Sequence, residues 1–598
     1  MKRLLVFALL FAGCPAKSRV PRDAGVREAP AVELTSEATT YRLTFDGHRQ
    51  HLVDVQVAVP TTGRDVVTFM MPTWTPGSYL VREYARHVEG VRAFDESGAP
   101  LSVEKVRKNR WRIDADGRAG VKLTYRVYAR DLSVRGSFVG ADFAMLNGAS
   151  VFVTDVDHLE RQHRVRIEHP YAESLTALPR ADVWIVADDY DALVDAPILL
   201  GRPDTQTFDV DGTAYVLATV GGDDDFDTER AASDVAKLAA TQQAFWPGTP
   251  FDRYVFMNVL VETGGGLEHG ASTVVMGSRF ASRDDETYRG WLGVMSHELF
   301  HAWNGKRLRP RALGPFDYEN EVYTEDLWFV EGFTSYYDDL LLARAGLMTQ
   351  AQWLGALSKN IERVETRPGR HHQSLAEASY DAWIKFYRPD ENAHNTSVSY
   401  YSQGAVVAFL ADAAIREATR GRRSLDDVMR EAYRQYAGEV GFSREALFDV
   451  FEAVGGPAVR ELVVTMVRTT RPLDYDDAFD FYGIRFAKKD KSESAYLGVE
   501  HSKDKVVTEV LRGTPAYVAG IEVGDELIAY DGDRIQGVGR DLTGREPGSK
   551  VQVLLSRRRK LRTVEVKLGE VPRRPKVERE PSASTLARRN LEALLTPR

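Results

Sequence analysis

The sequence predicts a multidomain protein of the α+β class. Its 598 residues are too many for one hydrophobic core, so several domains are expected. Strand-like alternation fills the first third of the chain, helical periodicity begins after about residue 228, and strand alternation returns near residue 496. We therefore expect an all-β N-terminal domain over 41–220, a mixed α+β domain over 221–345, a helical extension of it over 346–480 and a small β-rich domain over 485–570.

The composition is that of an ordinary globular protein. Hydrophobic residues make up 43% of the chain and charged residues 28%. The 78 Lys and Arg residues against 87 Asp and Glu give a formal net charge of -9, and no basic stripe interleaved with aromatic residues runs through the central region. A nucleic-acid partner is therefore not expected.

The N-terminus is typical of an exported bacterial lipoprotein. Lys2 and Arg3 precede an apolar run from Leu4 to Phe11 that is too short to span a bilayer. Cys14 stands where a lipoprotein signal places its lipidated residue, although Phe11 occupies a position where Leu is usual. We expect a signal peptide over 1–14 and a lipid anchor that holds the chain to a membrane on its periplasmic or cell-surface side; simple secretion is the alternative.

The segments outside the predicted domains are polar. Residues 15–40 carry three prolines among Lys, Arg, Glu, Ser and Thr without apolar periodicity, which predicts a flexible linker. Residues 571–598 are rich in Arg, Lys, Pro and Glu and predict a charged, solvated tail with a short helix near its end. Cys14 is the only cysteine, so the chain has no intramolecular disulfide.

The strongest chemical signal is the HExxH motif His297-Glu298-Leu299-Phe300-His301. It lies in a segment with helical periodicity that we expect to begin with Ser282 as its cap. Positions i and i+4 lie on the same face of a helix, so His297 and His301 can bind one zinc ion while Glu298 acts as general base on the water that the metal activates. The alternative is a pair of hydrogen-bonded core histidines beside a solvated Glu298.

A catalytic zinc needs a third protein ligand and an open fourth position. Glu331 is a lone acid in an otherwise apolar helical run, where an unpaired carboxylate would be unfavourable. Glu319 and Glu321 remain alternatives, because they lie at the spacing found in the commonest zinc peptidases, but in a loop rich in Pro and Gly. We predict one Zn²⁺ per chain, held by His297, His301 and Glu331.

Four motifs stand out together. They are Trp74 to Tyr79, Gly265 to His269, His297 to His301 continuing through Trp303, Lys306, Arg307 and Pro310, and Leu327-Trp328 with Glu331-Gly332. Together they resemble the glycyl aminopeptidases, metallopeptidase family 61. The resemblance covers about 41–570 and implies a thermolysin-like (gluzincin) zinc domain between an N-terminal β-domain and a C-terminal PDZ domain. It also implies Glu331 as the third zinc ligand and a small N-terminal substrate residue, Gly or Ala.

The segment Gly265-Gly266-Leu267-Glu268-His269 follows a predicted strand and precedes the zinc helix. The resemblance implies an edge strand along which the substrate backbone lies, so Gly265 and Gly266 are expected to bind substrate. Glu268 would then pair with the substrate's free α-ammonium. A glycine turn with an exposed acid is the alternative. His269 has a weaker case as a residue that supports the zinc ligands.

A second expectation from the resemblance concerns Tyr400-Tyr401-Ser402-Gln403-Gly404, which opens another predicted helix. In related aminopeptidases a Tyr three residues before Gly donates its hydroxyl to the oxyanion, which implies Tyr401 here. Those relatives usually carry Lys where this chain has Gln403, and Tyr400 is the alternative donor.

Tyr496-Leu497-Gly498-Val499 and the run from Gly513 to Asp525 resemble a bacterial PDZ domain. Backbone N–H groups of the first loop would bind the carboxylate of a peptide C-terminus. The alternative is a PDZ fold that only packs against the enzyme.

These observations together predict a zinc aminopeptidase that hydrolyses the N-terminal peptide bond of peptides. Two alternatives remain. One is a zinc endopeptidase of the same fold, in which Glu268 does not bind an amine. The other is an exported PDZ adaptor whose peptidase domain is inactive. The expected partners are peptide substrates and, through the lipid anchor alone, a membrane.

Overall fold

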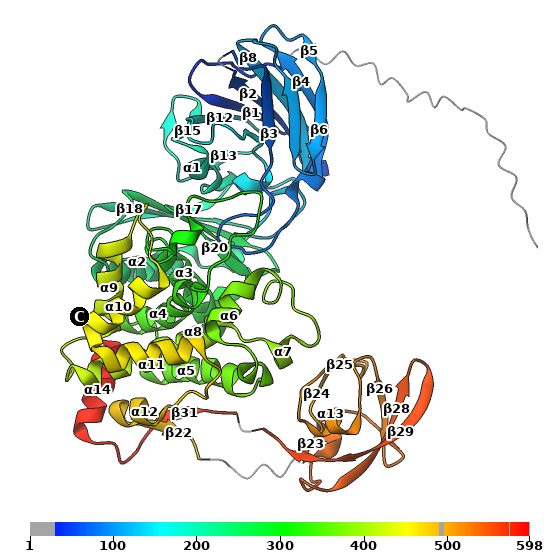
Figure 1. The fold of residues 1–598 in the computed structure, drawn as a ribbon, viewed down its shortest axis with the longest axis vertical. Helices are drawn as coiled ribbons and strands as arrows, with labels where there is room; N and C mark the ends of the chain where they lie inside the picture. Colours follow the sequence, from blue (N-terminus) through cyan, green and yellow to red (C-terminus); the bar gives the residue numbers. More distant parts are fainter. Residues whose placement is uncertain (1–29, 62, 489–494, 573, 597–598) are drawn as a thin grey trace, which may run out of the picture.

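The computed structural model describes residues 30–61, 63–488, 495–572 and 574–596 (Figure 1). The expected signal peptide over 1–14, with Cys14, and most of the expected linker over 15–40 lie outside the described residues. Along the chain come a β-rich N-terminal domain, a central domain with a five-stranded sheet and most of the helices, and a small C-terminal domain (Figure 1). None of the described helices combines the length and the apolar character that crossing a bilayer requires.

The N-terminal domain, residues 30–202, is built from three sheets around a core of its own. In its long strand β2, the side chains of Val53, Val55, Val57 and Val59 are all buried, as the two-residue period of a strand predicts. The eight-stranded sheet runs in the order β14 (Arg180–Ala181), β15 (Trp184–Ala187), β12 (His163–Glu168), β1 (Thr39–Thr44), β2 (Leu52–Pro60), β8 (Gly120–Tyr128), β4 (Val88–Asp95), β5 (Pro100–Leu101). The two smaller sheets are β11 (Thr154–Asp155), β3 (Val66–Met70), β7 (Arg110–Asp114), β6 (Val103–Arg107), and β13 (Glu173–Leu175), β16 (Ile198–Gly201), β10 (Ala144–Leu146), β9 (Phe138–Val139). One short helix, α1 (Tyr190–Val194), precedes β16.

The central domain, residues 204–486, begins with a five-stranded sheet. Its order is β17 (Asp204–Val210), β18 (Thr213–Val220), β19 (Arg253–Leu260), β21 (Ser272–Gly277), β20 (Gly265–Glu268). β18, β19 and β21 are parallel, whereas β20 runs antiparallel to β21 and forms one edge of the sheet. The expected edge strand at Gly265 to Glu268 is therefore present. The helix α2 (Thr228–Phe245) connects β18 to β19.

The helix that carries the HExxH motif, α3 (Asp285–His301), begins later than the sequence suggests. Asp284 is its N-cap, with an extended backbone and a side chain that accepts the N–H of Thr287 at 2.7 Å. Ser282 lies in the preceding 3₁₀ turn and instead accepts the backbone N–H of Asp227, at the start of α2. The prediction of Ser282 as the cap is therefore wrong, because its hydroxyl is used in a contact between two elements.

Further helices fill the rest of the central domain and bury one large continuous core. They are the π-helical turn η7 (Trp328–Gly332), α4 (Phe333–Arg344), α5 (Gln350–Glu365), α6 (Leu375–Tyr380), α7 (Ala393–Thr396), α8 (Tyr400–Ala418), α9 (Leu425–Tyr436), α10 (Arg444–Gly455), α11 (Pro457–Arg468) and α12 (Asp476–Tyr482).

The C-terminal domain, residues 495–570, has a separate core. Its elements are β23 (Ala495–Tyr496), β24 (Val499–His501), β25 (Val507–Val510), α13 (Pro515–Ala519), β26 (Glu526–Tyr530), β27 (Asp533–Arg534), β28 (Lys550–Arg557), β29 (Lys560–Lys567) and β30 (Gly569–Glu570). It contacts α7 of the central domain. The Asn395 side chain donates to the carbonyl of Val510 at 2.9 Å and accepts the N–H of Arg512 at 2.8 Å, and His394 lies 2.7 Å from the Glu509 carboxylate.

The segment expected to be a solvated tail, 571–598, instead returns to the central domain over its described part. β31 (Val577–Arg579) pairs with β22 (Ile484–Phe486), and α14 (Thr585–Leu595) packs beside α4 and α12. Leu591 and Leu594 are buried in the central core, and the Arg344 side chain donates to the carbonyl of Leu594 at 3.1 Å. The expectation of a solvated tail fails because one face of this charged helix is apolar.

Candidate active site

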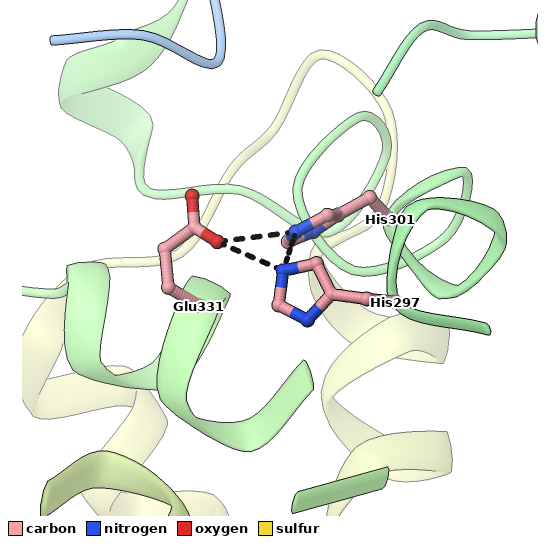
Figure 2. A group of neighbouring side chains, drawn as sticks. All are labelled: His297, His301 and Glu331. Carbon is pink, nitrogen blue, oxygen red and sulfur yellow. Dashed lines mark hydrogen bonds and ion pairs between the residues drawn. The ribbon is translucent and has the colours of Figure 1, made fainter. Parts of the chain in front are cut away.

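One face of α3 presents both histidines of the motif to Glu331 (Figure 2). His297 Nε2 lies 3.4 Å and His301 Nε2 3.1 Å from the same Glu331 oxygen, and the two ring nitrogens are 3.0 Å apart. Ligand atoms about 2.1 Å from one ion at tetrahedral angles lie about 3.4 Å from each other. The three side chains therefore form a metal-binding group with the nitrogen and oxygen donors that zinc accepts.

Glu331 reaches this position through a distorted stretch of helix. It lies in the π-helical turn η7, a rare conformation that is found mostly at functional sites. A Cβ on Gly332 would lie 2.5 Å from the Cα of Gly404, and one on Gly404 would lie 2.7 Å from the carbonyl of Trp328. The two glycines thus let the backbones of η7 and α8 cross in contact, which sets Glu331 beside the first turn of α8.

Two further groups fix the orientation of the histidine rings. The Nδ1–H of His301 donates to the carbonyl of Asn304 at 2.7 Å, and the Nδ1–H of His297 donates to the Asp338 carboxylate at 3.1 Å. Each bond leaves the Nε2 lone pair turned toward Glu331, as a metal site requires. Asp338 was not among the residues predicted from the sequence, although it follows Glu331 by seven residues, a spacing that keeps both residues on one side of a regular helix.

The electrostatics of the site also fit a bound cation. Burial opposes ionisation of Glu331, but the neighbouring His301 and His297 lower the pKa of its carboxyl to about 2, so it is a carboxylate at neutral pH. Burial likewise lowers the pKa of His301, but the Glu331 carboxylate more than offsets this and raises the pKa overall. Two imidazolium rings 3.0 Å apart would repel each other, whereas one divalent ion bound to the two neutral rings and the carboxylate avoids this repulsion.

Glu298 lies in the same cleft, with its side chain 6% exposed. A Cβ on Gly266 would lie 2.1 Å from its carboxylate, so only glycine at this point of β20 leaves room for it. Its Oε2 atom is buried and accepts no hydrogen bond from the described residues. Burial raises the pKa of Glu298 to about 7, while the charge of His297 acts in the opposite direction. Such a carboxyl can take up and release a proton near neutral pH.

Glu268 ends the edge strand β20, and its side chain is 8% exposed. The N-terminal domain covers it: a Cβ on Gly77 would lie 2.6 Å from both carboxylate oxygens. Gly77 belongs to the Trp74 to Tyr79 motif. Trp74 and Tyr79 pack into the core of the central domain rather than that of their own domain. This anchors the loop so that Gly77 closes over Glu268.

Tyr401 lines the cleft, and its ring stacks on that of His297 at a centroid distance of 6.0 Å. Tyr400 is completely buried, and its hydroxyl makes no hydrogen bond within the described residues. Of the two tyrosines that the sequence left open, Tyr401 is the one with access to the cleft. A third tyrosine, Tyr387, was not predicted from the sequence; it lines the cleft, and its hydroxyl donates to the carbonyl of Gly77 at 3.4 Å.

The other acids considered from the sequence lie outside the metal-binding group. Glu319 forms an ion pair with Arg110 of the N-terminal domain, and Glu321 is exposed. His269 is buried 3.3 Å from Asp195, which also accepts a hydrogen bond from Lys306 at 2.6 Å. The N-terminal and central domains are thus connected through the side chains of Glu319, His269 and Lys306. None of these three residues forms part of the metal-binding group.

The loop Tyr496 to Val499 lies in the C-terminal domain, at the junction of β23 and β24. The N–H of Ala516 donates to the carbonyl of Leu497 at 2.8 Å, and the Thr514 hydroxyl donates to that of Gly498 at 3.2 Å. Gly498 has a φ of 90°, a conformation that favours glycine. These contacts hold the loop against the start of α13.

Comparison with known families agrees with this geometry. Residues 290–407 match the model of the M61 glycyl aminopeptidases, residues 40–202 match the M61 N-terminal domain, and residues 482–568 match the PDZ domain. The N-terminal domain and part of the central domain are thus similar to those of the M61 glycyl aminopeptidases, and a PDZ domain follows them. This confirms the predicted multidomain fold class.

One solved structure gives the same result for the fold. An aminopeptidase N family protein from Idiomarina loihiensis is 29% identical, covers 94% of this chain and 100% of its own, and superposes with a TM-score of 0.88. An M1 zinc metallopeptidase from Deinococcus radiodurans is 13% identical over 74% of this chain and 95% of its own, with a TM-score of 0.46. No curated protein matches the chain. The family match and the metal-binding group together identify the chain as an enzyme, a zinc metallopeptidase.

The hydrogen bond between Asp338 and His297 gives a prediction for metal affinity. Asp338→Asn weakens the acceptor that orients the ring, so zinc affinity is expected to fall about 10- to 100-fold. Competition with a chromogenic chelator measures this. Asp339→Asn, which removes a neighbouring acid that forms no hydrogen bond or ion pair with either histidine, is the matched control. An unchanged affinity in Asp338→Asn would show that Asp338 does not support the metal ligands.

Proposed function

We propose that this M61-type zinc metallopeptidase is an aminopeptidase that removes a small N-terminal residue, Gly or Ala, from peptides. The observation that carries the proposal is the placement of Glu268. Its buried carboxylate ends the edge strand beside the metal-binding group, and Gly77 of the N-terminal domain closes over it. A carboxylate enclosed in this way gives the substrate's α-ammonium one fixed position, which selects the first peptide bond. The match to the glycyl aminopeptidase family supports the small residue.

The metal-binding group would hold the zinc. Bound by His297, His301 and Glu331, a zinc ion would polarise the scissile carbonyl and make a water molecule more acidic. Asp338 and the carbonyl of Asn304 keep the two imidazoles oriented for this task.

Glu298 is the residue we assign as general base. Glu298 lines the cleft, where its carboxylate can take a proton from the attacking water and pass it to the leaving amine. The Tyr401 hydroxyl would donate to the oxygen of the scissile carbonyl as negative charge develops there. One water is consumed, and the products are the free N-terminal amino acid and the shortened peptide.

Substitution of the general base separates chemistry from metal binding. Glu298→Gln keeps the size of the side chain but cannot accept a proton, so kcat is expected to fall about 100- to 10,000-fold. Release of a chromophore from alanyl and glycyl anilides measures activity, and metal analysis of the same protein should still find zinc. A variant that keeps wild-type activity would remove Glu298 from the mechanism.

Blocking the substrate amine tests the assignment of Glu268. An N-acetylated peptide cannot offer an ammonium, so we expect hydrolysis of Ala-Ala-Ala and none of its acetylated form, as judged by chromatography of the products. Glu268→Gln should lower kcat/KM for the free peptide about 10- to 100-fold. Glu262→Gln, an exposed acid near the same strand, is the control. Cleavage of the acetylated peptide at wild-type rates would instead indicate an endopeptidase.

We also propose that the enzyme is exported and anchored to a membrane by a lipid on Cys14. The support is the sequence alone, with its basic start, its short apolar run and its single cysteine. Full-length protein expressed in bacteria should partition into the detergent phase of Triton X-114, and Cys14→Ser into the aqueous phase. Equal partitioning of the two proteins would exclude the lipid anchor.

A further inference from the structure

The cleft around the metal-binding group has a volume of about 920 Å³, and one of the residues lining it, Arg135, takes no part in the mechanism above. Arg135 comes from the N-terminal domain, in the loop between β8 and β9. The loop is held in place on both sides of this residue. Val134 is buried in the same apolar cluster as Leu267 of β20, and the Tyr84 hydroxyl donates to the carbonyl of Arg135 at 2.5 Å.

The guanidinium of Arg135 is unpaired. It makes no ion pair and donates no side-chain hydrogen bond to any of the described residues, and its Nε atom is buried without a partner. Asp131, the nearest acid along the loop, is exposed and forms no ion pair with it. A guanidinium that lines the cleft without an ion pair can bind an anionic group of a molecule in the cleft.

The position of Arg135 beside β20 indicates which group of a bound peptide it would bind. A Cβ on Gly265 would lie 3.8 Å from Arg135 Nη1, so the guanidinium lies at the start of β20, whereas Glu268 lies at its end. Glu298 lies beside Gly266, and therefore between the Arg135 end and the Glu268 end of β20. A peptide with its ammonium at Glu268 and its first carbonyl near Glu298 must therefore run antiparallel to β20, toward Gly265 and Arg135.

The length of this path selects short peptides. From Glu268 to Gly265 the strand advances three residues, which is about 10 Å. An extended tripeptide spans about the same distance between its ends. The two ends of the path also carry opposite charges, a carboxylate at Glu268 and a guanidinium at Arg135, which match the ammonium and the carboxylate of one short peptide.

We propose that Arg135 binds the C-terminal carboxylate of the substrate, and that the enzyme is therefore selective for tripeptides with a free C-terminus. The proposal rests on the aminopeptidase function proposed above. Arginine and a carboxylate form paired, charge-assisted hydrogen bonds, so Arg135 contributes specificity at the end of the substrate that is not cleaved.

The test compares Ala-Ala-Ala with its C-terminal amide, Ala-Ala-Ala-NH₂. The wild-type enzyme is expected to show a kcat/KM about 10- to 100-fold higher for the acid, because the amide lacks the charge that Arg135 binds. Arg135→Ala should lower kcat/KM for the acid by this factor and remove the difference between the two peptides. Arg135→Lys keeps the positive charge, so this variant should retain part of the preference for the acid over the amide. Lengthening the peptide to six alanines should lower the wild-type kcat/KM.

Arg289→Ala is the matched control. Arg289 also lines the cleft, but it lies on α3 nine residues before Glu298, about 14 Å along the helix axis, and its substitution should leave the acid-to-amide ratio unchanged. Equal rates for acid and amide in the wild type, or an equal loss on both in Arg135→Ala, would overturn the proposal. Hydrolysis of the acetylated peptide would instead overturn the aminopeptidase assignment, while the acid-to-amide ratio would still report on Arg135.

Discussion

Three groups that each offer a lone pair converge inside the central domain: the Nε2 atoms of His297 and His301 and a carboxylate oxygen of Glu331. Buried acceptors that face each other are unfavourable unless a cation joins them. The surrounding structure nevertheless holds them together, through the spacing of α3, the π-helical turn η7 and the glycine contact between η7 and α8. These features are accounted for together if the site is built around a divalent ion.

The N-terminal domain completes the site and does not merely precede it. Gly77 closes over Glu268, and Arg135 reaches the other end of the same edge strand. The two domains are joined by the ion pairs of Glu319 with Arg110 and of Asp195 with Lys306. The shape of the cleft thus depends on how the two domains dock. The Trp74 to Tyr79 motif contributes to this docking and places Gly77 over Glu268, a role that its sequence alone did not reveal.

The sequence could predict whatever depends on local periodicity. The spacing of His297 and His301, and the isolation of Glu331 in an apolar run, follow from helix geometry and from the unfavourable burial of a lone carboxylate. It could not predict contacts between segments far apart in the chain, such as Gly77 over Glu268, because these depend on domain docking. The packing of the tail over 571–598 against the central domain could not be predicted either, because it too is a contact between segments far apart in the chain. Its composition is charged, but the few apolar side chains of α14 decide where it packs.

The central claim is that one zinc ion is bound by the three converging side chains. Anomalous X-ray diffraction from crystals of the purified enzyme, recorded on both sides of the zinc absorption edge, tests it directly. We expect one strong peak per chain, about 2.0–2.2 Å from the Nε2 atoms of His297 and His301 and from an oxygen of Glu331. No peak at this position in crystals of active enzyme, or a peak bound by other residues, would contradict the account.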